Sequence, residues 1–491
     1  MGARAELNTL EAGGLIEIAA LQPELEYLFR HALVQDAAYS SLLKQDRRTL
    51  HLAAAETILA LNPGRESELA AVVAMHFEQG GDGGQAATYL VLAGDHALQR
   101  FANQEALAFF RRAVALSEPG QGEVRLRAAI GLARAGWGFA GSKSLIADIE
   151  KGIADGNTAG SDLLTEGYFW LAFLRRMAGE TAESSPELRN ALARANELGG
   201  EFADPTTAAV PRALMGAFAA FSGHLREGAR EMSQALGVIE AKGDPVSAAM
   251  VANFLSAAYS KLGEFAAAEE IIAHSTRFAE KGDAIAMLDR DIALAEFHLE
   301  QGEPIEAGKS AQACSTRAEE LGAFACVVAS NVIGGAANLA RDDALAAKGP
   351  LDRGFELCRV VNFAPLRTMT YALLGSTRAE LGDEPGAVAD WTEALSSARA
   401  MNDRYGEAHT LWGRGRAQAR RPDADLAVAL ADLDQAIELF ERMEARPAVA
   451  RALLDRGIVL RRKGRNADAA SDERRAHDLA RELGLKDIAT E

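Results

Sequence analysis

The sequence predicts an all-α protein, a superhelix of stacked helical hairpins that repeat about every forty residues. Apolar residues make up 48% of the chain but aromatic residues only 6%, and this alanine-rich composition favours closely packed helices over a sheet. Glycines recur in two series that stay in phase. A chain of 491 residues is too long for one compact core, but a repeat array escapes that limit because each unit packs only on its neighbours.

The two series mark the ends of paired helices. Glycine just past a helix end, or asparagine in its place, adopts the left-handed conformation of a C-cap. The first series ends the first helix of each pair, and comprises Gly179, Gly223, Gly263, Gly302, Gly382 and Gly464. The second ends the second helix, and comprises Gly199, Gly243, Gly282, Gly322, Asn402 and Gly484. Two weaker units carry Asp342-Asp343 and Pro422-Asp423 where the first glycine is expected.

Small residues also keep the phase of the repeat. Five residues after the first mark stand Gly228, Ala268, Ala307, Ala387 and Ala469, which let the second helix lie close against the first. Larger residues are expected to fill the seams between pairs, namely Phe265, Ile272, Trp391 and Leu395. Stacked pairs of this kind wind into a superhelix with a concave face.

The N-terminal residues differ from the rest of the chain. The runs 14–18 and 25–29 have partial strand alternation, and Gln22-Pro23 lies between them, so a hairpin is expected after a short helix that ends near 8–11. One long amphipathic helix is expected over 37–61, ended by Asn62-Pro63-Gly64. Three further helices are expected, at 66–79, 85–100 and 104–116.

Two segments resemble the tetratricopeptide repeat. These are WTEAL, from Trp391 to Leu395, and LGEFAAAEE, from Leu262 to Glu270. The period is longer than the usual 34 residues, as in the extended repeats of large bacterial signalling ATPases and transcription activators. The resemblance covers about residues 66–487. It implies a protein, peptide or small effector bound in the concave face, in a signal-transduction role.

A second resemblance lies at the start of the chain. The segment YLFRHALVQDAAYSSLL, residues 27–43, with Arg47-Arg48 and Leu50-His51 after it, is similar to the junction in bacterial STAND-type ATPase regulators. In that family a winged-helix-like domain ends there and the helical repeats begin. Some members carry a class III adenylate/guanylate cyclase domain, and others are transcription activators.

The second resemblance also supplies candidate interface residues. It implies that Phe29, Leu33, Tyr39 and Leu42 bury a seam, and that Arg30 and His31 hold polar contacts across it. Gln35 is a further candidate at the same junction. A purely structural role for His31 and Arg30 is the alternative.

The resemblance implies four parts. Residues 1–50 would be the tail of a winged-helix-like domain and a junction helix, and 51–120 the first helical repeats. Residues 121–162 would be an irregular helical joint, broken at Gly141 and at 156–160, and 163–491 the repeat superhelix.

The motifs of the catalytic domains are missing from the sequence. There is no Walker A lysine, no Walker B aspartate and no set of cyclase metal-binding aspartates, and no helix-turn-helix follows the repeats. Either the chain is a C-terminal fragment, or another chain supplies an ATPase or cyclase module. We therefore expect a non-catalytic sensory or scaffolding module. The resemblance implies that this module is the C-terminal regulatory part of a STAND ATPase or cyclase. The alternative is that the protein is an adenylate/guanylate cyclase or ATP-binding transcriptional regulator whose catalytic part lies outside this chain.

No other segment predicts a catalytic, cofactor or metal site. The run Gly302–Ser310 has five residues between its glycines, one of them a proline, whereas a phosphate loop needs four. His274, His298 and His409 fall on repeat helices without metal-ligand spacing. We expect no cofactor and no catalytic residue.

Charge and cysteine usage restrict the partners. The net charge of −18 argues against nucleic acid or an anionic membrane. The cluster Arg461, Arg462, Lys463 and Arg465 is expected to be a solvated helix end, with a phosphate-binding patch as the alternative. The uncharged run 321–340 predicts a buried repeat helix. Three cysteines without a CxxC pair, and a first segment without a signal-peptide core, predict buried thiols in the cytoplasm.

Overall fold

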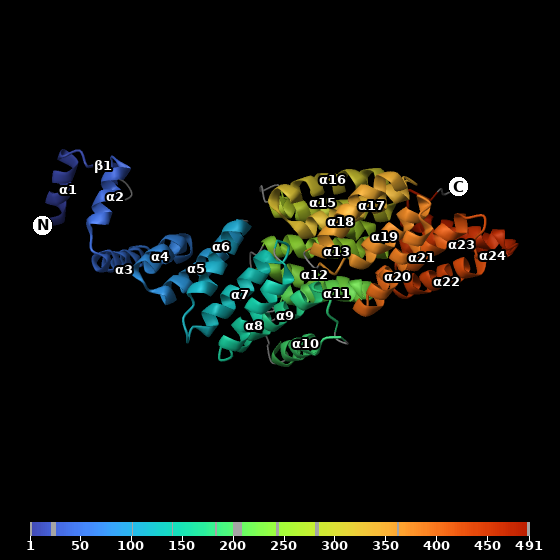
Figure 1. Cartoon of the computed structure of the whole chain (residues 1–491), viewed down its shortest axis with the longest axis horizontal. Coiled ribbons are helices and arrows are strands. Elements are labelled where there is room, and N and C mark those ends of the chain that lie inside the picture. The colour runs from blue at the N-terminus through green and yellow to red at the C-terminus, as the bar shows by residue number, and fades with distance from the viewer. Residues whose placement is uncertain are drawn as a thin grey trace.

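The structure, a computed structural model, describes residues 2–20, 26–100, 102–139, 141–181, 184–199, 209–241, 245–279, 284–360 and 363–488. These residues form helices and one two-stranded sheet. Figure 1 shows an elongated molecule whose N-terminal elements stand apart at one end. The elements before the array are α1 (Gly2–Ala12), β1 (Ile16–Ala20), β2 (Glu26–Phe29), α2 (Ala32–Ser41), α3 (Lys44–Leu61), α4 (Glu66–Gly80), α5 (Gly83–Gln99), α6 (Asn103–Leu116), α7 (Gly122–Gly136) and α8 (Ser142–Asp155).

The array that follows consists of paired helices, as the two series predict. Its helices are α9 (Ser161–Met177), α10 (Pro186–Gly199), α11 (Ala209–Phe221), α12 (Leu225–Ala241), α13 (Pro245–Leu262), α14 (Phe265–Ala279), α15 (Ala284–Gln301), α16 (Pro304–Leu321), α17 (Phe324–Ala340), α18 (Ala344–Val360), α19 (Arg367–Glu380), α20 (Glu384–Met401), α21 (Arg404–Arg420), α22 (Leu426–Arg442), α23 (Arg446–Arg462) and α24 (Asn466–Leu483). The fold is therefore the predicted all-α, tetratricopeptide-like superhelix of helical hairpins.

The glycine series has the predicted backbone conformation. All six glycines of the first series have positive φ, between +76° and +95°. In the second series Gly322, Asn402 and Gly484 are left-handed C-caps, and Gly199 is the last residue of α10. Gly243 and Gly282 lie outside the described residues. In one weak unit Asp342 takes the left-handed conformation itself, with φ +57°.

The other weak unit ends without a left-handed residue. The C-cap of α21 is Arg421, which is extended, because the residue before a proline is disfavoured in helical conformation. The small positions pack as predicted, since Ala268, Ala307, Ala387 and Ala469 are all fully buried. The four predicted seam residues are also buried, at 2% to 8% exposure.

Successive turns of the superhelix touch each other. A Cβ added to Gly302 would lie 2.7 Å from the backbone nitrogen of Asp487, and one added to Gly179 would lie 3.0 Å from Ala364. Both pairs are 185 residues apart in sequence, which is about four and a half units. Gly179 and Gly302 thus allow both the turn itself and the close approach of the next superhelical turn.

The N-terminal part corrects two expectations. The predicted helix over 37–61 is two helices, α2 and α3, because Leu42 and Leu43 are both extended. The predicted breaks at Gly141 and at 156–160 are present, since Gly141 and Gly156 cap the two ends of α8, but the expected irregular joint consists of two regular helices, α7 and α8. The hairpin is present, with Ile16 opposite Phe29, while Gln22-Pro23 lies outside the described residues. That this part belongs to a winged-helix domain stays a prediction.

Within the described ranges, no helix is both long enough and apolar enough to cross a membrane. The uncharged run 321–340 is mostly α17, and it packs inside the array between α15, α16, α18 and α19.

Candidate functional site: the inner cavity

The superhelix encloses a cavity of about 520 Å³. The first helix of every pair from α9 to α23 contributes to its lining. In stacked hairpins the first helices face the superhelical axis and the second helices form the outer layer. Because the turns touch, the concave surface of this array is an inner chamber rather than an open groove.

Aromatic side chains form the wall of the cavity near α9, α11 and α13. Phe173 meets Trp137 edge to face at a centroid distance of 5.6 Å, and lies 5.5 Å from Phe218. Phe221 and Phe254 continue the cluster, with 6.3 Å between their rings. Such rings bury apolar groups of a ligand.

Small residues leave the space that this wall encloses. On α17, the cavity is lined by alanines that include Ala325, Ala329 and Ala336. These residues come from the uncharged run 321–340, so its lack of large side chains serves to make room.

A buried lysine stands at the polar wall. Lys261 on α13 is 8% exposed and forms an ion pair with Glu296 of α15. Its ammonium lies 5.3 Å from the centre of the Tyr405 ring. Burial lowers the pKa of Lys261 to about 8, although Glu300 and Asp403 oppose the shift.

Arg451 closes the same wall from the next superhelical turn. It donates hydrogen bonds to Asp487 at 2.6 Å and to the backbone oxygen of Glu300 at 2.8 Å. The carboxylate of Glu300 accepts a hydrogen bond from the Tyr405 hydroxyl at 2.9 Å. These contacts join α15, α21, α23 and the residues after α24 around one end of the cavity.

One face of α21 points its polar and aromatic side chains into the cavity. Tyr405, His409, Trp412 and Arg416 all line it, at the spacing of a single helical face. The Trp412 indole donates a hydrogen bond to Asp455 at 2.7 Å. Burial lowers the pKa of His409 to about 3, and the positive charges of Lys261 and Arg451 contribute. His409 is therefore neutral at pH 7, and its buried Nε2 has no hydrogen-bond partner among the residues that the structure describes.

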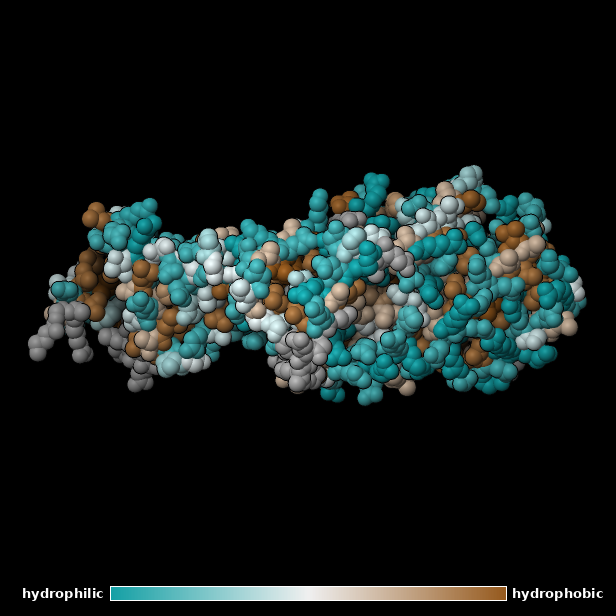
Figure 2. Space-filling view, turned by 90° about the horizontal axis from the view of Figure 1, so that it is seen from below, coloured by the Kyte–Doolittle hydropathy of each residue, from teal (hydrophilic) through white to brown (hydrophobic). Residues whose placement is uncertain are grey.

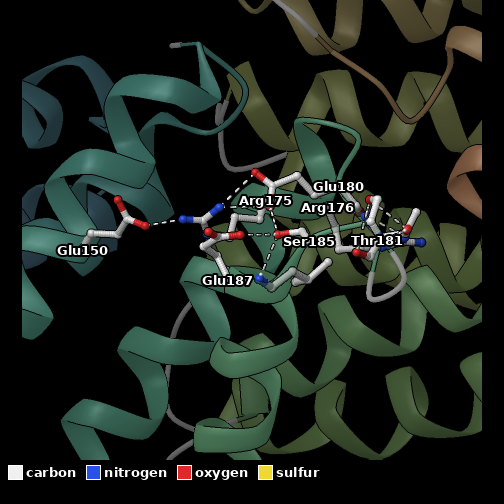
Figure 3. Close-up of polar contacts among 9 residues, drawn as sticks. Glu150, Arg175, Arg176, Glu180, Thr181, Ser185 and Glu187 are labelled. Carbon is white, nitrogen blue, oxygen red and sulfur yellow. Dashed lines mark hydrogen bonds and ion pairs between the residues drawn. The ribbon is translucent and has the colours of Figure 1, made fainter.

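Figure 3 shows the polar contacts that hold α9, the first helix of the array, through Arg175 and Arg176. Phe173 and Met177 of α9 line the cavity, while Arg175 of the same helix is 9% exposed and joins Glu150 of α8 to Glu180. The neighbouring Arg176 donates to the backbone oxygen of Glu180 at 3.2 Å. The two arginines thus fix α9 against both α8 and the following turn.

The junction residues predicted from the sequence lie far from the cavity, on α2 and beside it. Among the described residues these side chains are not buried: Phe29 is 43% exposed and Leu33 82% exposed, and α2 has no buried residue. That they form a seam with another module stays a prediction. Arg30, His31, Gln35 and Tyr39 are exposed and Leu42 is half-buried. The reason is that α2 makes few contacts in the described chain, chiefly with β2 and, through Tyr39, with His51 and Arg47 of α3. Figure 2 shows hydrophobic side chains at the surface of this end.

Polar contacts at the junction run toward α4 instead. The Tyr39 hydroxyl lies 2.9 Å from His51 Nε2, and His51 Nδ1 lies 2.9 Å from His76 Nδ1. Arg47 lies over the Tyr39 ring at 5.2 Å. Arg30 forms an ion pair with Glu17 at 3.3 Å.

Other candidate residues have structural partners. Arg462 donates to the backbone oxygen of Ala419 at 2.6 Å, and Arg461 and Arg465 form ion pairs with acidic residues of α24, which favours the solvated helix end over a phosphate patch. His274 and His298 each contact a glutamate. In the described part of the chain, no three potential metal ligands come together.

Sequence reasoning missed the cavity residues. His409 was placed among ordinary repeat histidines, and neither Lys261 nor Asp455 was selected. The sequence signal for such residues is the polar and aromatic face of α21. In the first helix of a pair, the side chains that face the superhelical axis are ordinarily apolar or small.

One known structure shares this fold over most of its length. It is the crystal structure of a Rap protein complexed with Competence and Sporulation Factor, with a TM-score of 0.57, 14% identity, and coverage of 75% of this chain and 99% of that chain. Aspartyl phosphate phosphatase F from Bacillus subtilis matches with a TM-score of 0.33 and 10% identity, covering 82% of this chain and 96% of that one.

A STAND protein with a tetratricopeptide repeat sensor from Pyrococcus horikoshii matches with a TM-score of 0.34 and 12% identity, covering 92% of this chain and 66% of that one. No protein-family model matches the chain. No curated protein sequence matches it either.

Proposed function

We propose that this chain is a non-catalytic sensor module, and that it binds a short peptide in the inner cavity. The observation that carries the proposal is the chamber itself, which combines an aromatic wall, a wall of small residues and a polar wall from eight successive repeats. A peptide offers apolar side chains and a polar backbone to match these walls. The similar fold of a Rap protein, solved as a complex with Competence and Sporulation Factor, supports ligand binding by this fold.

The binding step has a structural consequence in this proposal. The cavity is bounded by two superhelical turns that contact each other, so a ligand inside it contacts both. Its binding energy would therefore shift the relative position of the turns, and occupancy would reach the outer surface of the array.

Affinity selection from a random hexapeptide library tests this function. The chain is incubated with the library, bound peptides are identified by mass spectrometry, and their affinity is measured by calorimetry. In Ala329→Phe a ring fills the cavity, and we expect binding to be lost. Ala346→Phe places the same ring on an exposed position of α18 and should bind normally. Absence of binding to the unsubstituted chain, or equal binding by Ala329→Phe, would contradict the proposal.

We further propose that the module works in the cytoplasm as the regulatory part of a STAND ATPase or a nucleotide cyclase. The exposed apolar side chains of the N-terminal end support this, since Leu33 and Leu43 are 82% and 72% exposed and such patches mark interaction sites. A winged-helix-bearing ATPase or cyclase module, in the same or another chain, would cover them.

A mixing experiment tests the second proposal. Sedimentation of the chain with a separately purified STAND ATPase module should reveal a complex, and Leu33→Glu should weaken it. Leu345→Glu, at a position 76% exposed on α18, is the matched control. Tight ATP binding or cyclic-nucleotide production by the chain alone would contradict its non-catalytic role.

A further inference from the structure

The charged residues of the inner cavity are mostly acidic. Among the lining residues are seven carboxylates and three lysine or arginine cations. The carboxylates are Asp289, Glu296, Glu300, Glu380, Asp403, Asp455 and Asp487, and the cations are Lys261, Arg416 and Arg451. His409 adds no positive charge at pH 7, because its pKa is lowered to about 3.

All three cations already have partners. Lys261 is paired with Glu296, and Arg451 is paired with Asp487 and Glu300. Arg416 contacts Asp342 at 3.3 Å, and Asp342 is not part of the lining. An anionic group entering the cavity would thus find no cation without a carboxylate partner, and would meet an excess of negative charge.

Asp455 is the carboxylate best placed to receive a ligand. It lies on α23 and lines the cavity, and its partner is the indole N–H of Trp412. Among the described residues it takes part in no ion pair. Burial raises the pKa of Asp455, which Arg416 and the Trp412 hydrogen bond offset in part. A carboxylate in such surroundings gains stability when a cation comes into contact with it.

Aromatic rings lie around the Trp412 indole, which is the hydrogen-bond partner of this carboxylate. Trp412 lies 5.3 Å from the His409 ring and 6.2 Å from Phe440, centroid to centroid. The indole ring also lines the cavity. A carboxylate beside an indole recognises a guanidinium or an ammonium group twice, by charge and by cation–π attraction.

We propose that the peptide held in the inner cavity carries a basic side chain, and that this side chain binds between the Asp455 carboxylate and the Trp412 ring. The inference rests on the proposed function, that the cavity binds a peptide, and specifies the chemistry of that peptide. The apolar remainder of the peptide contacts the aromatic wall formed by Phe173, Phe218 and Phe254.

The same hexapeptide selection, performed on three chains, tests the inference. For the unsubstituted chain we expect retained peptides to be enriched in lysine and arginine over the library. Asp455→Asn keeps the size of the side chain and a hydrogen-bond acceptor for Trp412, but removes the charge. It should abolish the enrichment and weaken binding of a selected basic peptide roughly tenfold or more. Glu438→Gln, at an exposed position of α22, should behave as the unsubstituted chain.

A second variant separates loss of the Asp455 charge from general damage to the cavity. Trp412→Phe removes the indole N–H but keeps a ring and the Asp455 charge, so the preference for basic peptides should persist. Circular dichroism confirms that each variant is folded. Peptides retained without a preference for lysine or arginine, or a preference that survives in Asp455→Asn, would overturn this inference while leaving the peptide-binding function intact. If no peptide is retained, the proposed function fails, and the inference with it.

Discussion

The ammonium of Lys486 lies 2.7 Å from the carboxylate of Glu303, although 183 residues separate them in the chain. The backbone N–H of Lys486 also donates to the carbonyl of Gln301 at 2.9 Å. These bonds join the end of α24 to the turn between α15 and α16. Because successive turns of the superhelix are bonded in this way, both turns contribute residues to the wall of the inner cavity.

The first prediction concerns Gly302, which lies under this contact. Gly302→Ala should destabilise the fold by about 3 kcal/mol, because φ is +88° and the new Cβ would meet the backbone of Asp487. Gly382→Ala is the matched control, with φ +86° in the same turn of another unit and open space around it. It should cost about 1 kcal/mol. If urea unfolding shows that both variants lose the same free energy of unfolding, the two superhelical turns are not in close contact at Gly302.

The second prediction concerns His409 and pH. Its folded pKa of about 3 lies below the ordinary value of about 6.5, so the unfolded chain binds a proton that the folded chain does not. Its contribution to stability is therefore present above pH 6.5 and is lost as pH falls toward 3. Between pH 6.5 and pH 5 the loss is about 2 kcal/mol. The free energy of unfolding of the native chain minus that of His409→Gln, measured with urea at each pH, should fall by that amount between pH 6.5 and pH 5. A difference that does not change with pH would contradict this prediction.

The third prediction concerns Arg175, the buried arginine of Figure 3. Arg175→Met removes the cation that joins Glu150 and Glu180 and should cost about 2–3 kcal/mol, since the partly buried Glu180 loses its partner. Arg127→Met is the control, because Arg127 and Glu123 form an exposed pair on α7 and such pairs contribute under about 1 kcal/mol. Thermal unfolding of both variants measures the difference in their loss of stability. Equal losses would show that α9 does not depend on the contacts of Arg175.

The fourth prediction concerns the three thiols. Burial raises the pKa of Cys314 to about 12 and that of Cys358 to about 11, and that of Cys326 well above its ordinary value. Very little thiolate is present at pH 8, so a thiol reagent should label none of them rapidly in the folded chain. In guanidinium chloride all three should react. Stoichiometric labelling of the native protein would show a reactive cysteine where none is expected.

The repeat could be predicted from the sequence because its signals are local. A left-handed residue after a helix, or an alanine where two helices of one pair cross, depends on neighbours within about forty residues. Gly263 and Ala268 are examples, since one has φ +80° and the other is fully buried. The break between α2 and α3 could not be predicted, because Leu42 and Leu43 are apolar and carry no helix-ending signal.

The cavity could not be predicted in the same way. Lys261, Glu300 and Tyr405 belong to three different units, and Arg451 to a fourth. Which of them meet depends on the rotation from one unit to the next, summed over about four units. That rotation results from small differences in packing at every seam, and no single motif encodes it.

The sequence by itself determined the all-α class, the period and the paired helices, because caps and close helix crossings are short-range requirements of the backbone. Only the tertiary structure decided that the concave face forms an inner cavity bounded by two superhelical turns, with an excess of carboxylates in its lining. The superhelical turns meet across about 185 residues, and the charges that face one another there are distant in the chain. Short-range steric requirements define each helical hairpin, whereas the rotation accumulated over many hairpins determines which residues line the cavity.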